Sequence, residues 1–578
     1  MVDSIRISIG GKKVISKTIT KTMFIAFGTL LSAASLQARV IPDAGSILRD
    51  QQFRQNPRLQ QLPSSEETKD HPPESGKGVQ VMVKGFVFRG YEGIVTEGEL
   101  QSITATYVGK KISYNELQSI VNEVTAFLKK KGWFLAKAYL PKQDVTSGII
   151  EIAVHQGKSD GSLSINKEKS VRIRTKLLQH IAALAIRRGQ PLNEKQLERS
   201  VLLMNDLPGI DAHASLAPGT IPNSSGVEIS VTEGPLFSGS AWADNQGNYY
   251  TGAWRGNTTL TFNDPLRYGD QVTLLLTEAS GLTQGRVGYS FPLYRNGVRG
   301  NLAYTGMRYT LGGELSGENY KGRSNNIDAG FSYSMHRSRT SNLTTSISYG
   351  YKALVDTWKS DAPLRDKQLS SATFTLSGDS NDHFYGGGYT SYNLGLTTGR
   401  LHESVADLKN NYTRLNFGAT RMQRLAQRVN FDVALSAQRA MNNLDSSEKF
   451  SFGGPNGIRA YPVGEAPGDE GQLLSTNLRY NMPVAAALGT FQISCFFDAG
   501  HVRLQKNEGV SPDTATKLNN YWIQGAGLGF NYAYLTKFAL RGSWAHVIGD
   551  NPGRYVSGNN SDGHNDKSRF WLQAMAYF

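Results

Sequence analysis

Arg459 and Asp498 are the residues of this chain whose types and positions most suggest a specific chemical interaction. Arg459 lies in a long loop, residues 445–471, whose segment 452–461 contains three glycines and a proline and therefore favours a folded, hairpin-like conformation. Period-2 alternation puts Asp498 on the polar face of the strand-like segment 491–498. An arginine can bind a carboxylate through two parallel hydrogen bonds, so this pair could fix the loop to the strand. The alternative is that both side chains are solvated.

Residues for enzymatic chemistry or metal binding form no recognised pattern. The sequence contains no H-E-x-x-H, G-x-S-x-G or phosphate-loop spacing, and its ten histidines are scattered. The acidic stretch 559–566 lacks the spacing of a calcium loop. The single cysteine, Cys495, shares the apolar face of its segment with Phe491, Ile493 and Phe497, as a small hydrophobic residue would. We therefore predict no enzyme, no cofactor and no metal site.

The element that must position Asp498 belongs to a long series of short alternating segments. Segments 342–351, 429–437 and 569–578 each have one apolar and one small or polar face. Residues 235–578 offer about 16 such segments, which is typical of an antiparallel barrel with lipid outside and water inside. The strands should be about 9–11 residues long. Glycines such as Gly525 should leave space in the lumen for other backbone to approach.

Composition agrees with a barrel and argues against other classes. The chain is 39% hydrophobic and lacks the run of about 20 apolar residues that a membrane helix needs. A barrel strand needs only about 10 residues, half of them apolar. The formal net charge of +14 could suggest nucleic acid, but the lysines and arginines are scattered. We therefore predict no nucleic-acid partner.

The N-terminal region reads as three segments. Residues 1–38 resemble a secretory signal, with a basic start, a short apolar stretch and small residues before the expected cleavage. Residues 39–62 include one polar, Gln- and Arg-rich helix from Ala44 to Leu62. Residues 63–79 form a linker rich in Pro, Ser and Glu. The helix has little of its own to pack against, so it is either a tethered arm or an element docked elsewhere.

Residues 80–157 and 158–234 are predicted to form two small α+β modules. In the first, Thr96 with Glu99 and Ser113 with Glu116 are capping boxes that begin two helices. The second of these helices carries one apolar stripe, which consists of Leu117, Ile120, Val121, Val124 and Leu128. Strands are expected over Val81–Phe88, Trp133–Leu140 and Ile149–Val154.

The second module repeats this plan. A strand near Ser162 is followed by a helix over Thr175–Arg188. Asn193 caps a second helix that runs to Asp206, and Val227–Thr232 is the closing strand.

With these elements in place, the chain resembles the TpsB transporters of two-partner secretion, the haemolysin secretion/activation family. The resemblance extends over the whole chain after the signal. It is carried by runs such as KKGWFLAKAYLP at 130–141, GQPLN at 189–193 and DNQG at 244–247. It implies two periplasmic POTRA modules followed by a 16-stranded antiparallel transmembrane β-barrel in the outer membrane of a Gram-negative cell. It also implies that the helix within 39–62 plugs the resting barrel.

The same resemblance assigns a role to the loop. In the family this loop folds back into the lumen, and the Arg of a V-R-G-Y tip pairs with the Asp of an F-x-x-G motif. Here the tip is Ile458-Arg459-Ala460-Tyr461 and the motif is Phe497-Asp498-Ala499-Gly500. Ala460 replaces the usual glycine, which matters if the backbone there has a positive φ. The residues assigned to this gating contact are Gly453, Gly454, Arg459, Tyr461, Asp498 and Gly500.

The resemblance finally implies a function and its partners. The POTRA modules would recognise an unfolded, secreted β-helical exoprotein of TpsA type, and the barrel would export it without ATP. That exoprotein could be an adhesin, a haemolysin or a contact-dependent toxin. Other expected partners are outer-membrane lipid and the barrel assembly machinery, and a monomer is the default for a closed barrel. Two strands are candidate edges for partner binding, through Trp133, Phe134, Ala136, Ala138, Leu140, Val227, Ile229 and Val231. The alternative function is an assembly factor for other outer-membrane barrels.

Overall fold

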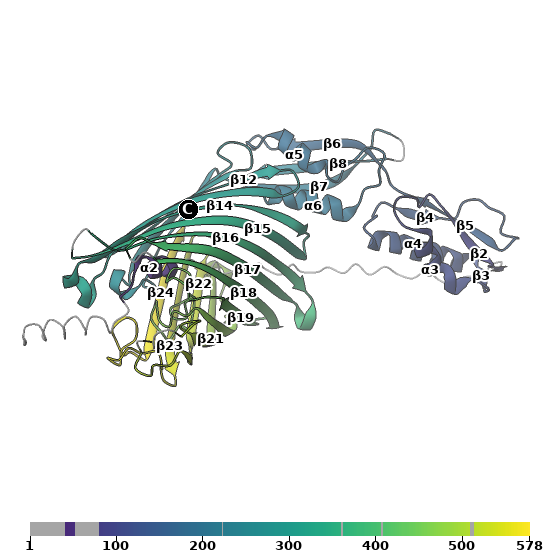
Figure 1. Ribbon diagram of the computed structural model, residues 1–578. Coiled ribbons are helices and arrows are strands. Elements are labelled where there is room, and N and C mark those ends of the chain that lie inside the picture. The colour runs from purple at the N-terminus through teal and green to yellow at the C-terminus, as the bar shows by residue number, and fades with distance from the viewer. Residues whose placement is uncertain are drawn as a thin grey trace, which may run out of the picture.

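The computed structural model describes residues 41–51, 80–221, 224–359, 362–405, 408–508, 512 and 514–578. It consists of a β-barrel, two small modules on one side of the barrel, and a short N-terminal helix inside it (Figure 1). The predicted signal segment, the linker 63–79 and most of the helix predicted to reach Leu62 lie outside the described residues. Within the described ranges, no helix has the length and apolar character needed to cross a membrane.

Residues 237–577 form a closed barrel of sixteen antiparallel strands, as the alternation predicted. The strands are β9 Phe237–Asp244, β10 Arg255–Asn263, β11 Gln271–Ala279, β12 Leu282–Tyr294, β13 Val298–Thr310, β14 Tyr320–Arg337, β15 Ser341–Trp358 and β16 Pro363–Asp382, followed by β17 Gly388–Glu403, β18 Leu408–Ala426, β19 Val429–Ala440, β20 Glu470–Asn481, β21 Thr490–Arg503, β22 Asn520–Tyr534, β23 Phe538–Ile548 and β24 Ser568–Tyr577. The last strand, β24, pairs with the first, β9, which closes the ring.

The barrel strands differ from the prediction in length. β16 has 20 residues, and β14 and β15 have 18 each. A membrane crossing needs only about 10 residues, so these strands continue into water on at least one side. Alternation along a strand reports which face a residue occupies, and it does not report where the membrane ends.

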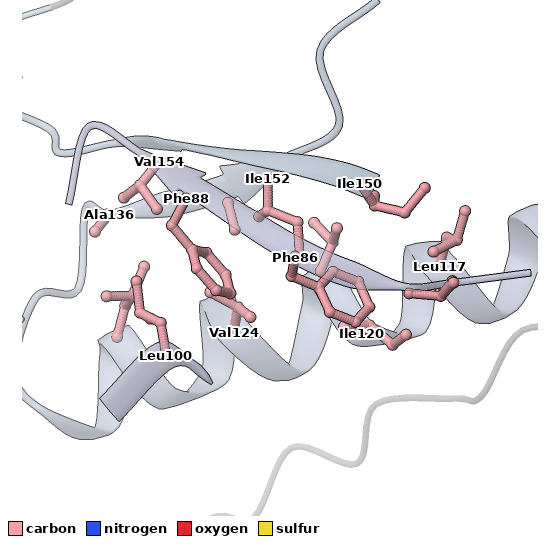
Figure 2. Close-up of a cluster of buried hydrophobic side chains, with 14 of the residues drawn as sticks. Phe86, Phe88, Leu100, Leu117, Ile120, Val124, Ala136, Ile150, Ile152 and Val154 are labelled. Atoms are coloured by element: carbon pink, nitrogen blue, oxygen red, sulfur yellow. The ribbon is translucent and has the colours of Figure 1, made fainter. Parts of the chain in front are cut away.

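The first module has a three-stranded and a two-stranded β-sheet and two helices. Its strands are β1 Gln80–Met82, β2 Gly85–Arg89, β3 Lys111–Ser113, β4 Lys137–Tyr139 and β5 Ile149–His155, and its helices are α3 Glu97–Thr104 and α4 Tyr114–Lys130. Both predicted capping boxes are present, at Thr96 and at Ser113. The five stripe residues of α4 are all buried, and Ile120 and Val124 pack against Phe86 and Phe88 of β2 (Figure 2).

The second module contains strands β6 Ser159–Lys167, β7 Ile210–Pro218 and β8 Ser225–Glu233 with helices α5 Thr175–Ala182 and α6 Glu194–Asn205. It lies against the strand turns at one end of the barrel (Figure 1). Asp206, which follows α6, forms an ion pair with Arg337 of β14 at 2.8 Å. The Arg174 guanidinium stacks 3.8 Å from the ring centre of Tyr268 in the turn between β10 and β11. The second module is therefore fixed to the barrel by two side-chain contacts, an ion pair and a cation–ring contact.

Several predicted boundaries in the modules were wrong. The strand expected over Val81–Phe88 is divided into β1 and β2, which belong to different sheets. Helix α5 ends at Ala182 rather than at Arg188. The run expected as a strand over Trp133–Leu140 is extended only at Lys137–Tyr139. Before β4, Trp133 donates a hydrogen bond from Nε1 to the carbonyl of Ile94, and the chain turns there instead of extending.

Candidate functional site

The long loop between β19 and β20, residues 441–469, folds into the barrel and is called the luminal loop below. Its tip, Ile458–Tyr461, lies against the wall formed by β20, β21 and β22. Tyr461 and Phe452 are among the largest fully buried side chains of the described chain. The loop holds its own shape through an isolated bridge between Gly453 and Ile458. A loop with this much buried surface is a packed element rather than a mobile surface segment.

Arg459 joins the tip to the wall through a two-pronged contact with Asp498 of β21. Its Nε donates to Asp498 Oδ2 at 2.8 Å and a terminal nitrogen donates to Oδ1 at 2.7 Å. The backbone N–H of Arg459 also donates to Oδ2, at 3.1 Å. The Asp498 side chain is fully buried, so it depends on these donors for compensation of its charge.

Other groups of the wall complete the surroundings of Arg459. The other terminal nitrogen, Nη1, donates to Asn477 Oδ1 at 3.0 Å, and Nη2, which also binds Asp498, donates to Ser475 Oγ at 3.2 Å; both acceptors are on β20. The guanidinium lies 3.3 Å from the ring centre of Phe496. Trp571 of β24 donates from Nε1 to the carbonyl oxygen of Arg459 at 2.8 Å. The tip is thus bonded to three strands of the wall, β20, β21 and β24.

The wall under the tip is lined with glycines. A Cβ at Gly500 would approach side-chain atoms of Phe452 and Ile458 to within 2.8 and 2.9 Å. A Cβ at Gly525 of β22 would lie only 2.4 Å from the Cβ of Ala460. Gly525 therefore leaves room for the extra methyl group of Ala460. The backbone of Ala460 is not among the described residues with positive φ, so an alanine is compatible with the tip.

The remaining predicted loop residues form its folded base. A Cβ at Gly453 would lie 2.2 Å from the carbonyl oxygen of Pro462, which excludes any side chain there. Gly454 has φ +99°, a conformation that favours glycine, and its N–H donates to the Tyr461 carbonyl at 3.0 Å. All six residues predicted for the loop contact thus lie in or directly beneath one packed unit.

Helix α2, Ala44–Asp50, occupies another part of the lumen. Ala44, Ile47 and Leu48 are buried against wall side chains, which are Tyr309, Leu354, Leu369 and Tyr412 among others. The helix begins with a capping box at Asp43, and the N–H of Ala44 donates to Asp356 Oδ1 at 2.8 Å. The part of the predicted arm that the structure describes is therefore docked inside the barrel.

Charged side chains connect α2 to both the wall and the luminal loop. Lys367 of β16 lies 3.1 Å from Asp43 Oδ2 and 2.8 Å from Asp445 Oδ2 of the loop. Arg365 and Ser446 also contact the Asp43 carboxylate, at 3.3 and 2.8 Å. Burial opposes ionisation of Asp43, but Lys367 and the hydrogen bonds outweigh it and lower the pKa of Asp43 well below its ordinary value. Asp43 is consequently ionised, and it binds the start of the helix to Lys367 and Arg365 on the wall.

The outer end of the luminal loop is closed by another loop. Glu465 is buried, and its carboxylate accepts hydrogen bonds at 2.7 Å from Asn551 Nδ2 and from the Ser561 N–H, both in the loop between β23 and β24. Burial raises the pKa of Glu465, since these neutral donors compensate only part of its charge and Asp562 lies nearby. The two loops are therefore joined at a carboxyl group whose charge is poorly compensated.

The residues predicted to bind a partner are placed differently from expectation. Val227, Ile229 and Val231 lie on β8, which is the central strand of the order β6-β8-β7, and all are buried. The closing strand of this module inserts between a parallel and an antiparallel neighbour, so it has no free edge. β4 is an edge strand, as predicted, but Ala136 and Ala138 are buried in the module core.

The aromatic run before β4 joins the two modules. Phe134, with Leu135, packs against the apolar core of the second module, whereas Trp133 and Leu140 pack against the first. These half-buried side chains therefore stabilise the two module cores, and their predicted role in partner binding stays a prediction.

Ser475, Asn477 and Trp571 are contact residues that sequence reasoning did not assign to the site. Alternation already indicated the face of Trp571, but only the register of β24 across the lumen relates it to Arg459. The Lys367 contacts lacked any local signal, because Asp43 and Lys367 are more than 300 residues apart. Over the described ranges, no group of three or more His, Cys, Asp or Glu side chains could hold a metal ion.

A closed barrel with an inserted loop, an inserted helix and POTRA-like modules at one end defines an outer-membrane transporter of the two-partner secretion class, with its modules in the periplasm. The sequence profile described as haemolysin secretion/activation protein ShlB/FhaC/HecB matches residues 223–532. That of the ShlB-type POTRA domain matches residues 81–157. The chain belongs to the ShlB/FhaC/HecB family.

Relatives and solved structures agree with this family. The haem/haemopexin transporter protein HuxB of Haemophilus influenzae (strain Rd) is 26% identical over 573 residues, which covers 96% of this chain and 98% of that protein. The outer membrane transporter CdiB of Escherichia coli O6:K15:H31 is 22% identical and covers 86% of each chain. The solved structure of CdiB from Escherichia coli is similar over all of both chains, with a TM-score of 0.71 at 17% identity, and shows the shared fold. The family is one of transporters and not of enzymes.

Proposed function

We propose that this transporter captures an unfolded exoprotein at the edges of its periplasmic modules and passes it through the barrel to the cell surface. The proposal rests above all on α2, which occupies the lumen and is held at its N-terminal end by side-chain contacts to Lys367 and Arg365. The buried Asp43–Lys367 pair regains solvation when it opens to water, and this offsets part of the attraction that is lost. Export then requires α2 to leave the lumen, and the chain after it, which continues to β1, serves as its tether.

Two exposed sheet edges support the capture step. Among the described strands, β4 pairs only with β5, and β7 pairs only with β8. An extended polypeptide can add to such an edge through backbone hydrogen bonds, which tolerate many sequences. Tyr139 on β4 and Leu216 on β7 are 48% and 44% exposed, so each edge also offers an apolar side chain. We assign capture in the second module to β7 rather than to β8.

The exported chain supplies the driving force in this scheme. The sequence contains no phosphate loop, and the periplasm provides no ATP. If the β-helical partner folds only after it emerges, folding prevents its return and makes export unidirectional. The Arg459–Asp498 contact keeps the luminal loop in the shape that lets the barrel conduct.

A reversible cross-link tests the movement of α2. Asp43 Oδ2 and Ser446 Oγ are 2.8 Å apart, so Asp43→Cys with Ser446→Cys, in a Cys495→Ser background, places two thiols where the helix meets the loop. We expect oxidation to abolish secretion of a candidate exoprotein encoded beside this gene and reduction to restore it. Each single-cysteine variant controls for the lost contacts. Normal secretion by the fully cross-linked protein would disprove the displacement of α2.

Depletion of the protein separates secretion from barrel assembly. We expect the exoprotein to disappear from the surface while other outer-membrane barrels keep their normal levels. A general loss of barrels, with the exoprotein unaffected, would instead identify an assembly factor.

A further inference from the structure

Two arginines lie directly opposite each other on the lipid-facing surface of the barrel. Arg308 of β13 and Arg323 of β14 are cross-strand partners, and both side chains are exposed. Like charges in this position repel, so they destabilise the sheet unless an anion lies between them. Neither guanidinium has an ion pair or hydrogen bond to any residue in the described part of the chain. The carboxylates of this cross-strand row, Glu278 and Asp366, are each two strands away from the pair, and Glu278 accepts from Thr283 Oγ1 at 2.9 Å.

The height of this pair matches the lipid headgroups of the outer leaflet. Below Arg323, the outward residues of β14 include exposed apolar side chains from Ile327 to Met335. This interval, at about 3.3 Å per residue on a strand tilted by about 40°, covers about 20 Å of the roughly 25 Å apolar band of an outer-membrane barrel. Tyr304 follows at the upper boundary, where its hydroxyl donates to Asn325 at 2.8 Å, as interfacial tyrosines do. The modules are at the other end, so the arginine pair is at the extracellular side.

A groove lies on the membrane side of Arg308. It has a volume of about 270 Å³ and is bordered by Leu274, Leu276, Val287 and Tyr304. Its floor is formed by Gly285 and Gly306, which are cross-strand partners. A Cβ at Gly285 would meet no atom within 3.6 Å, and one at Gly306 none within 3.4 Å. Both glycines have φ values outside the positive range. The fold therefore does not require glycine at either position, and the groove needs another explanation.

We propose that this surface is a binding site for a phosphorylated lipid of the outer leaflet. The phosphate would lie between Arg308 and Arg323, where two guanidinium groups can each bind it through paired hydrogen bonds. An acyl chain of the same lipid would lie in the groove over Gly306. The phosphate compensates the repulsion of the two arginines, and the acyl chain fills a groove that is apolar and concave. Such a lipid would brace β12, β13 and β14, and Tyr309 on the lumen face of β13 lies in the apolar cluster that includes α2.

Lipid titration of the purified full chain tests the site. The probe is lipid A, a phosphorylated and acylated glucosamine disaccharide, added to protein in detergent and counted as bound copies by native mass spectrometry. We expect Arg308→Gln with Arg323→Gln to weaken lipid A binding by about tenfold or more, because each charge-assisted contact is lost. Arg400→Gln is the matched control, since Arg400 is also exposed near the outer end of its strand but pairs with Asn411 and Ser370. Equal binding by the double variant and the control would overturn the proposal.

Two further arms identify the source of the phosphate and the role of the groove. Gly306→Val fills the groove and should weaken binding of lipid A. The much higher concentration of inorganic phosphate that is needed to occupy the arginine pair should not change. Dephosphorylated lipid A should bind as weakly to the wild type as lipid A binds to the double variant. If inorganic phosphate displaces lipid A at similar concentrations, the site takes a free anion and the lipid assignment is wrong. If the dephosphorylated lipid binds as tightly as lipid A, the arginines have no headgroup role and the proposal fails.

Discussion

The lumen holds two inserts, the tip of the luminal loop and helix α2, and the wall receives them differently. The tip fits a floor of Gly500 and Gly525 with almost no spare space, and its charged contact is the two-pronged pair of Arg459 with a fully buried carboxylate. Helix α2 is only seven residues long, and its charged contacts are single contacts made by flexible side chains. This contrast supports the proposal that the tip remains in place while the helix leaves the lumen.

Removal of Arg459 should have the largest effect on this difference. Arg459→Ala leaves Asp498 buried without a cation, which destabilises the tip by about 3–5 kcal/mol. We expect secretion to be lost and the barrel to unfold at lower temperature, measured by heat-dependent gel mobility. Arg459→Lys keeps the charge but loses the paired geometry, so its effect should be intermediate. Wild-type secretion by Arg459→Ala at normal barrel levels would show that the pair does not hold the loop.

A size exchange at the floor tests the close fit directly. Gly525→Ala places a methyl group 2.4 Å from Ala460 Cβ and should destabilise the barrel by about 1–3 kcal/mol. Addition of Ala460→Gly should recover most of the loss, because the next contact is then the His546 carbonyl at 3.2 Å. The measurement is a double-mutant cycle on thermal unfolding. Additive effects of the two changes would mean that the residues do not share this space.

A substitution at Lys367, which holds helix α2, should change the exit of α2 from the lumen more than it changes the free energy of unfolding of the barrel. Lys367→Met removes the cation shared by Asp43 and Asp445 while it keeps a similar length of side chain. We expect α2 to leave the lumen about tenfold more often, seen as a larger open fraction in planar-bilayer conductance. Arg365→Gln should have a smaller effect, since Arg365 is the more exposed of the two cations. Unchanged conductance together with a lower unfolding temperature would mean that Lys367 is structural.

The tip of the luminal loop and helix α2 also differ in how far their contacts could be predicted from the sequence. Period-2 alternation identified sixteen strands and the inward face of Asp498, because each strand reports its own faces locally. Capping boxes fixed the starts of α3 and α4 for the same reason. The pairing of Arg459 with Asp498 was recognisable because both lie in short motifs. The contacts of α2 were not, since any of several luminal cations could have met Asp43.

Strand order within the modules was also beyond local signals. The apolar pattern of Val227, Ile229 and Val231 correctly indicated a strand, but it is the same for an edge and for a buried central strand. The Trp133–Leu140 run has the composition of a strand, yet its aromatic side chains pack into the module junction. Tertiary packing decided both cases.

The smallest effect is expected at Glu465, where the test asks whether the luminal loop also has a contact that can open. Burial raises the pKa of Glu465 although the N–H donors of Asn551 and Ser561 oppose this shift, so the closed, buried state favours the protonated carboxyl. The contact is therefore most stable below the ordinary carboxyl pKa of about 4.3 and weakens as the pH rises through the raised value. Within this window the opening equilibrium can change by up to about tenfold per pH unit. Above the raised pKa it should become constant again.

Hydrogen–deuterium exchange of the loop between β23 and β24 measures this opening, after correction for the intrinsic effect of pH. We expect protection of the Ser561 amide to fall with rising pH in the wild type and to be independent of pH in Glu465→Gln. Arg554, Asp562, Tyr461 and Tyr521 surround the site, but Asp562 is already paired with Arg569 at 2.7 Å. An unchanged pH profile in Glu465→Gln would assign the effect to one of these neighbours, and the luminal loop would then be fixed at its outer end as firmly as at its tip.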